Sequence, residues 1–352
     1  KKINFGGRCC FFPAIRDCPK ERIDNPAALL YSRITLNRND RNARKGRCLM
    51  LTTEQRLRML ETPQTTFDLV IDTDAYNEID DQFAISYALR AQDRLHLLAL
   101  CAAPFHNERS TGPADGMEKS YQEILKLLSL AGENVPVYRG STTYLPDEKT
   151  PVPSDAAQAL AQLAMEHTTE NPLYVAAIGA ITNVASALLM QPEIADRMVL
   201  VWLGGSALHW PDNQEFNILQ DVAAARVAFD SGVPLVLLPC HGVVTHFTTT
   251  GPELEYWLRG KNPLCDYLVQ QTEDAANAYA KGHVWSRVIW DVTTIGWLLN
   301  REGKFMADRL IPTPIPQYDH HYSEDFRRPL CRYVYMIRRD ELFEDLFTRL
   351  AR

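Results

Sequence analysis

The stretch Phe67-Asp-Leu-Val-Ile-Asp-Thr-Asp-Ala-Tyr-Asn-Glu-Ile-Asp-Asp81 decides the fold of this chain. It opens with a short apolar run of the length of a buried β-strand, and residues 81–91 then repeat apolar side chains at helical spacing. A strand, an acidic loop and a helix in this order form the unit from which parallel sheets are built. Ligands bind at the carboxyl ends of such strands, so we expect the acidic loop at a binding edge.

The alternation of strand and helix continues to the end of the chain. Further strand-like runs lie at 95–103, 135–138, 173–178, 197–203, 234–239 and 331–337. Helical patterns lie at 116–131, 156–167, 181–190, 221–231, 252–258, 263–280, 291–300 and 341–350. We therefore predict an α/β fold in which residues 67–352 form a single domain, with a mostly parallel, Rossmann-like central sheet flanked by helices.

The bulk composition is that of a globular protein, with 46% hydrophobic and 23% charged residues among 352. The net charge of −7 gives no reason to expect nucleic acid or an anionic membrane surface as a partner. No apolar run approaches the roughly 18 residues needed to span a bilayer. Cys101, Cys240, Cys265 and Cys331 are scattered through apolar segments, which indicates reduced thiols in a cytoplasmic protein.

Residues 1–49 differ from the rest, because they carry 12 Lys/Arg but only 4 Asp/Glu and lack any sustained periodicity. We expect a basic, disordered extension without a catalytic part, or coding sequence upstream of a natural start at Met50. Residues 50–66 are predicted to form a short helical lead-in. In it, Thr52 or Thr53 is placed to cap a helix over residues 54–60.

The acidic loop predicts a divalent-cation site. Four aspartates and Glu78 lie within ten residues, and carboxylates this close raise each other's pKa unless a cation lies between them. Helix capping is the alternative, but it accounts for only one or two of these carboxylates. An EF-hand would need Gly and Glu where Asn77 and Phe83 stand. A phosphatase of the haloacid dehalogenase type shares the Asp-x-Asp start but has no need of the second aspartate pair.

Five later motifs follow the loop in a fixed order. They are Ala-Pro-Phe-His-Asn107, Ala176-Ala-Ile-Gly-Ala-Ile-Thr-Asn183, Val201-Trp-Leu-Gly-Gly205, Glu215-Phe-Asn217-Ile-Leu-Gln-Asp221 and Ile289-Trp-Asp291. Together with the loop they resemble the nucleoside hydrolase family, which includes inosine–uridine-preferring and purine-preferring ribohydrolases. The resemblance runs from residue 67 to the C-terminus. It implies the nucleoside hydrolase fold and a Ca²⁺-dependent enzyme that hydrolyses the N-glycosidic bond of ribonucleosides to free base and ribose.

The resemblance also implies a catalytic and metal-binding set. Asp74 would be both a Ca²⁺ ligand and the general base that activates water. Asp81, Asp291 and the backbone carbonyl of Ile178 would be the other protein ligands. Asp80 would hold the ribose 2′-hydroxyl or the attacking water.

A second set of residues would bind the substrate. By the same resemblance, Asn107, Glu215 and Asn217 would bind ribose hydroxyls, and Leu203 would pack against the sugar. Trp290 would stack on the base. The partner would be a small ribonucleoside, and we expect the enzyme to act as a homo-oligomer, either dimer or tetramer.

Two departures from the family pattern bear on specificity. The loop has five residues between Asp74 and Asp80, where the best-known members have three; some bacterial members share the longer form. Trp290 stands where the inosine–uridine type has a histidine that protonates the leaving base, and the purine-preferring type has tryptophan there. The chain is therefore expected to prefer purines, with His283 and Tyr279 as other candidates near the base.

Two alternatives to this enzyme stay open. One is a hydrolase of the same fold that acts on another ribosyl compound, and the other is a non-catalytic homologue that binds Ca²⁺ and a ribosyl ligand. The pair His320-His321 is expected at the surface rather than at a metal. Cys240 and His241 suggest a nucleophile pair, but neighbouring side chains at a strand end point apart, so we expect none.

Overall fold

The computed structural model describes residues 51–352. The basic extension predicted over residues 1–49 lies outside the described residues, as does Met50. The lead-in helix is present as α2 (Thr53–Met59). Its cap is Thr52, whose side chain accepts a hydrogen bond from the Gln55 backbone N–H while the Gln55 side chain bonds back to the Thr52 N–H. This reciprocal capping box fixes where the helix begins.

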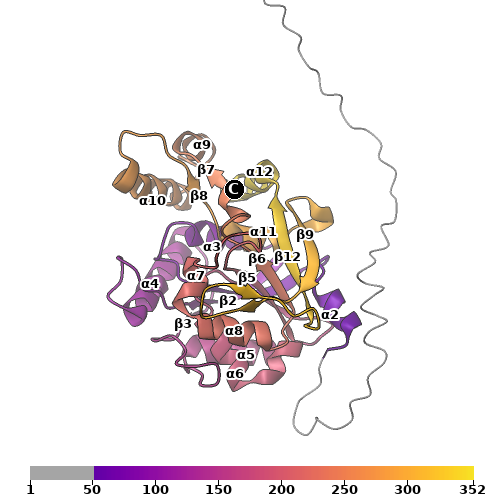
Figure 1. Ribbon diagram of the computed structural model, residues 1–352. Helices are drawn as coiled ribbons and strands as arrows, with labels where there is room; N and C mark the ends of the chain where they lie inside the picture. Colours follow the sequence, from indigo (N-terminus) through magenta and orange to yellow (C-terminus); the bar gives the residue numbers. More distant parts are fainter. Residues whose placement is uncertain (1–50) are drawn as a thin grey trace, which may run out of the picture. The chain divides into compact units, whose positions relative to one another are not determined.

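A sheet of eight strands lies at the centre, in the order β3-β2-β1-β4-β5-β6-β12-β9 (Figure 1). The strands are β1 (Phe67–Thr73), β2 (Leu95–Ala102), β3 (Val137–Arg139), β4 (Leu173–Ala177), β5 (Met198–Leu203), β6 (Leu235–Leu238), β9 (Met306–Pro312) and β12 (Leu330–Ile337). All neighbouring pairs are parallel except β12 and β9, which run antiparallel. The predicted mostly parallel α/β sheet is confirmed.

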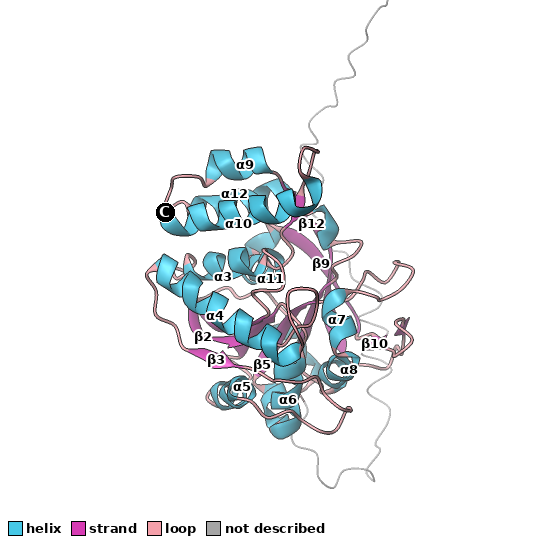
Figure 2. Cartoon of the chain, turned by 90° about the vertical axis from the view of Figure 1, so that its left-hand side faces the viewer, coloured by secondary structure: helices cyan, strands magenta, loops and turns pink. Residues whose placement is uncertain are grey.

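Helices cover both faces of this sheet (Figure 2). One face packs on α5 (Asp155–Met165), α6 (Thr182–Met190) and α8 (Val222–Asp230), and the other on α3 (Asp81–Leu89), α4 (Pro113–Ala131), α11 (Val292–Leu298) and α12 (Arg339–Leu350). Within residues 51–352, the remaining helices are α7 (Phe216–Gln220), α9 (Gly251–Trp257), α10 (Pro263–Ala280) and the 3₁₀ turns η1 (Pro192–Asp196), η2 (Val244–His246) and η3 (Arg301–Gly303). Because both faces are covered, every residue of β4 and β5 is buried, which explains why these strands read as unbroken apolar runs.

The chain order places a binding site at the middle of the sheet. From β1 the chain builds outward through β2 and β3, and then returns to place β4 on the other side of β1. The point where the strand order reverses in this way is where α/β sheets bind ligands, at the carboxyl ends of the strands. The acidic loop follows β1 and Ile178 follows β4, so both lie at this point.

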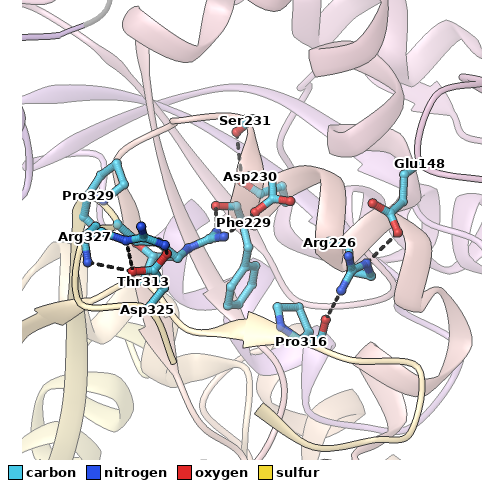
Figure 3. A network of polar contacts seen from close by, with 12 residues as sticks. Glu148, Arg226, Phe229, Asp230, Ser231, Thr313, Pro316, Asp325, Arg327 and Pro329 are labelled. Carbon is cyan, nitrogen blue, oxygen red and sulfur yellow. Dashed lines mark hydrogen bonds and ion pairs between the residues drawn. The ribbon is translucent and has the colours of Figure 1, made fainter. Parts of the chain in front are cut away.

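Two small antiparallel pairs lie outside the main sheet: β7 (Thr248–Thr249) with β8 (Arg287–Val288), and β10 (Ile315–Pro316) with β11 (Tyr322–Ser323). Figure 3 shows how the β10–β11 hairpin is joined to α8: Arg226 pairs with Glu148 and donates to the Pro316 carbonyl at 2.6 Å. Arg328 donates to the Phe229 carbonyl at 2.6 Å. The hairpin is therefore fixed to the helix that follows the Glu215 motif.

The scattered cysteines Cys101, Cys240, Cys265 and Cys331 are free thiols buried in the structure. Within residues 51–352, no helix combines the length and the apolar composition needed to cross a lipid bilayer.

Candidate active site

Three carboxylates from two distant parts of the chain meet at the carboxyl edge of the sheet. Asp80 precedes α3, Asp81 begins it, and Asp291 precedes α11. All three are at most 3% exposed, and each offers an oxygen within 4.8 Å of the others. Among residues 51–352, this is the one group of acidic, histidine or cysteine side chains with the spacing of a metal site. The fold thus brings together residues that are more than 200 positions apart in the sequence.

Asp74 lies beside this group with neither carboxylate oxygen hydrogen-bonded, although both are buried. Burial, and then the charges of Asp81 and Asp80, raise the pKa of Asp74 well above its usual range. A buried polar group without a partner is costly. A cation bound at these oxygens would give them the partners that they lack and would relieve the repulsion between the carboxylates.

The neighbouring carboxylates are perturbed in the same direction. Burial raises the pKa of Asp81 and of Asp291 well above normal, with Asp80 adding to both. Burial, with the charge of Glu78, raises the pKa of Asp80 to about 6. Arg287 forms its salt bridge with Glu78, at 2.7 Å. The site therefore holds concentrated negative charge on oxygen donors only, which fits a hard divalent cation such as Ca²⁺ or Mg²⁺.

Residues at the end of β1 hold the acidic loop in place. Thr73 donates a hydrogen bond from its hydroxyl to Asp81. Asp72 accepts one from the Asn183 side chain at 2.8 Å, and burial raises the pKa of Asp72 to about 7 in spite of that bond. Asp72 is thus engaged with α6 and supports the loop.

A cavity of about 160 Å³ opens over these carboxylates. Its lining consists of Asp74, Asn77, Glu78, Asp80, Asp81, Ile178, Leu203, Glu215, Phe216, Asn217, Cys240, His241, Trp290 and Asp291. The structure therefore gathers every predicted site residue except Asn107 around one cavity.

Glu215 and Asn217 brace the strand ends beneath the cavity. The Glu215 carboxylate accepts hydrogen bonds from the backbone N–H groups of Gly205 (2.7 Å) and Asn217 (3.0 Å), which caps α7. The Asn217 side chain donates to the carbonyls of Leu203 (3.0 Å) and Ile178 (3.4 Å). These bonds tie the ends of β4 and β5 together at the cavity floor.

The sequence comparisons identify the family. The model of the inosine-uridine preferring nucleoside hydrolase matches residues 69–321, well over half of the chain. This chain belongs to the nucleoside hydrolase family. It is an N-ribohydrolase, and its substrate class is the small ribonucleoside.

Relatives and solved structures agree with this assignment. The non-specific ribonucleoside hydrolase RihC of Salmonella typhimurium is 27% identical over 261 residues, spanning 66% of this chain and 79% of the relative. The fold matches that of a plant nucleoside hydrolase, the PpNRh1 enzyme (TM-score 0.65, 20% identity), over 81% of this chain and 99% of that one. It also matches the purine-preferring ribonucleoside hydrolase from Gardnerella vaginalis (TM-score 0.65, 19% identity), over 81% and 98%.

Asn107 meets the site of this hydrolase through Asn77, a residue of the acidic loop. The Asn107 side chain donates to the Asn77 side chain at 2.6 Å, and it is Asn77 that lines the cavity. Asn77 belongs to the longer spacer between Asp74 and Asp80. The unusual spacer length was the signal for it in the sequence, although length alone does not say which side chain turns inward.

Two aromatic rings, Trp290 and His241, are part of the lining of the hydrolase cavity. The Trp290 ring meets His241 edge to face, with centroids 6.4 Å apart, and Trp210 stacks on His241 at 5.7 Å. His241 lines the cavity, although none of the sequence motifs placed it there. His283 and Tyr279, the other candidates near the base, are exposed and do not line it. Among the described residues, His320 and His321 belong to no group with metal-site spacing.

Proposed function

We propose that this nucleoside hydrolase requires Ca²⁺ and prefers purine ribonucleosides. The observation that carries the metal requirement is the buried Asp74 carboxylate, whose two oxygens have no hydrogen-bond partner beside three further buried aspartates. Ca²⁺ accepts six to eight oxygen ligands in flexible geometry, which suits a crowded set of carboxylates better than the strict octahedron of Mg²⁺.

In this proposal the ion is held by Asp74, Asp81, Asp291 and the Ile178 carbonyl. Asp80 binds the ribose 2′-hydroxyl or the attacking water. When bound, the ion would lower the pKa of water at the site. Asp74 would take the proton from the attacking water, since both of its carboxylate oxygens are free of protein partners. The water oxygen then bonds to the anomeric carbon as the bond from that carbon to the base breaks.

The surrounding residues stabilise the sugar as it gains oxocarbenium character. The buried carboxylates below the ring favour that positive charge. Asn217, Glu215 and the Asn107–Asn77 pair offer polar atoms for the ribose hydroxyls, and Leu203 offers an apolar contact for the sugar. Fixing the hydroxyls in this way orients the anomeric carbon toward the water.

The purine preference rests on Trp290. Its indole lines the cavity, and an indole offers a large flat surface for a bicyclic base but no acidic proton. Stacking favours the larger purine ring system over a pyrimidine.

A reducing-sugar assay over a panel of purine and pyrimidine ribonucleosides, with and without a chelator, tests both parts. We expect turnover that is lost on chelation and restored by Ca²⁺, with purines ahead in kcat/KM. Full activity in chelator would overturn the metal requirement, and faster turnover of uridine than of inosine would overturn the preference.

Two lesser proposals concern the setting of the enzyme. The four free, buried thiols support a cytoplasmic, reducing compartment.

Helix α9 exposes Tyr256 (77%) and Trp257 (42%), and exposed aromatic side chains support a homo-oligomer. Light scattering of the purified chain, compared with a Tyr256→Ser variant, measures the oligomeric state directly.

A further inference from the structure

His241 lines the cavity and its ring contacts two tryptophans, Trp210 and Trp290. It follows β6, and its ring stacks on Trp210 with an interplanar angle of 30° while Trp290 meets it at 77°. Trp210 is 43% exposed. His241 and Trp290 line the same cavity as the carboxylates, whereas Trp210 does not line it and packs on the His241 ring.

The orientation of His241 is set by a chain of hydrogen bonds. Its Nδ1 lies 3.2 Å from the Ser206 hydroxyl, and the Ser206 backbone N–H donates to the Asn213 side chain at 2.7 Å. The Asn213 backbone N–H in turn donates to the His320 carbonyl at 2.7 Å. His320 belongs to the turn between β10 and β11, which Arg226 fixes to α8 (Figure 3). The His241 ring is thus held in place, through Ser206 and Asn213, by the β10–β11 turn.

These contacts leave the other ring nitrogen for a ligand. Within residues 51–352, no protein group is hydrogen-bonded to His241 Nε2. His241 is also the only histidine among the described residues that line the cavity. Imidazole is the side chain that most readily exchanges a proton near neutral pH.

The other ionisable groups in the lining are poorly suited to protonate a leaving base. Asp80, Asp81 and Asp291 form the group with the spacing of a metal site, and Asp74 lies beside them. Glu78 is paired with Arg287 at 2.7 Å, and Glu215 accepts hydrogen bonds from backbone N–H groups. Burial raises the pKa of the Cys240 thiol well above its usual range. Tryptophan has no acidic proton to give.

We propose that His241 is the general acid of this hydrolase, that its Nε2 proton passes to the departing base, and that Trp290 holds the base beside it while Trp210 packs on the His241 ring. The inference rests on the proposed function. Protonated His241 keeps its Nδ1–H bond to Ser206 and gives the Nε2 proton to a ring nitrogen of the base. The electron pair of the breaking N-glycosidic bond passes into the base, which leaves neutral. Asp74 holds the proton lost by water, so protons and charge balance.

The test compares two leaving groups in the same holoenzyme. Inosine needs a proton on its base, whereas p-nitrophenyl β-D-riboside releases a stable anion without one. We expect His241→Phe, which keeps an aromatic ring, to lower kcat on inosine by about 100-fold or more while changing kcat on the nitrophenyl riboside less than about threefold. His241→Gln retains a hydrogen-bonding group without a transferable proton, and it should show the same selective loss.

His209→Phe is the matched control, because His209 is an exposed histidine on the neighbouring loop and does not line the cavity. The variant should have the wild-type kcat on both substrates. The assignment would be overturned if His241→Phe lowered kcat equally on both substrates or on neither. It would also be overturned if His241→Gln had wild-type kcat on inosine, or if His209→Phe lost kcat on inosine alone. A wild-type enzyme inactive on both substrates would instead overturn the proposed function, and this inference with it.

Discussion

Gly179 lies directly against Asp74: a β-carbon at position 179 would come within 2.8 Å of Asp74 Oδ1 and 2.9 Å of its carboxyl carbon. Asp74 follows β1 and Gly179 follows β4, so the contact crosses the point where the strand order reverses. The absence of a side chain on Gly179 is therefore what lets the Asp74 carboxylate lie flat against the end of β4.

Replacing Gly179 with alanine should displace the Asp74 carboxylate. A displacement of about 1 Å in a catalytic group can cost about 100-fold in rate, and we expect a fall of that order in kcat for Gly179→Ala. Gly112→Ala is the control, because a β-carbon there meets nothing within 4 Å. Steady-state kinetics of the two variants measure the effect, and equal activities would contradict it.

Asp74→Asn should separate catalysis from stability. The amide cannot accept the proton from water, so kcat should fall by about 10³-fold or more. The same change removes one negative charge from a repulsive buried group, so the chelated variant should melt at a higher temperature than the chelated wild type. Kinetics and thermal melting in chelator report the two effects, and a variant that is both active and less stable would refute the assignment of Asp74.

The metal should matter more for stability as pH rises. Burial raises the pKa of Asp80 to about 6 and of Asp72 to about 7 in the metal-free protein, against ~3.9 in an unfolded chain. The folded protein then binds protons that the unfolded chain has lost. This contribution to stability is complete below about pH 4 and is lost as the pH rises toward about 7.

A bound cation favours the deprotonated carboxylates, so its stabilisation should grow over the same pH range. The measurement is the difference in melting temperature between Ca²⁺-saturated and chelated protein at several pH values. We expect that difference to widen from about pH 4 to about pH 7, and a constant or narrowing difference would count against the metal site.

The parallel core of this fold could be predicted from sequence because its strands are buried on both faces. Strands such as β5 are continuous apolar runs, which stand out against the helices between them. The edge strand β9 (Met306–Pro312) was missed because it is half-exposed and includes Asp308 and Arg309 among its residues. The β10–β11 hairpin has strands of only two residues and leaves no periodic signal.

The same division holds for the candidate site. Residues fixed by the ends of buried strands or the starts of helices, such as Asp81, Ile178 and Asp291, could be located from motifs. Asn77 and His241 could not, because their positions depend on the course of irregular loops. The ring of His241, for example, is oriented by Ser206, whose own place depends on a hairpin more than 100 residues further along the chain.

Thr73 should control metal affinity without touching the metal. Its hydroxyl donates to Asp81, and loss of such a supporting bond lowers metal affinity by about 10–100-fold. We expect Thr73→Val, which keeps the shape but removes the donor, to weaken Ca²⁺ binding by that amount. Thr73→Ser keeps the donor and should bind normally. Isothermal titration of both variants decides the matter, and equal affinities would show that the bond has no such role.

Discrimination against 2′-deoxynucleosides should depend on Asp80. A site built to bind a hydroxyl leaves its own buried polar groups unpaired when that hydroxyl is missing, so kcat/KM for 2′-deoxyinosine should lie at least about 10³-fold below that for inosine.

Asp80→Ala removes the protein partner of the 2′-hydroxyl. The value of kcat/KM should therefore fall far more for inosine than for 2′-deoxyinosine, and the ratio of the two values should shrink. The two substrates and two enzymes form a double-mutant cycle, which isolates the coupling of the carboxylate to the hydroxyl. A ratio unchanged by Asp80→Ala would mean that Asp80, which lies within 4.8 Å of the Asp81 and Asp291 oxygens, serves the metal rather than the ribose.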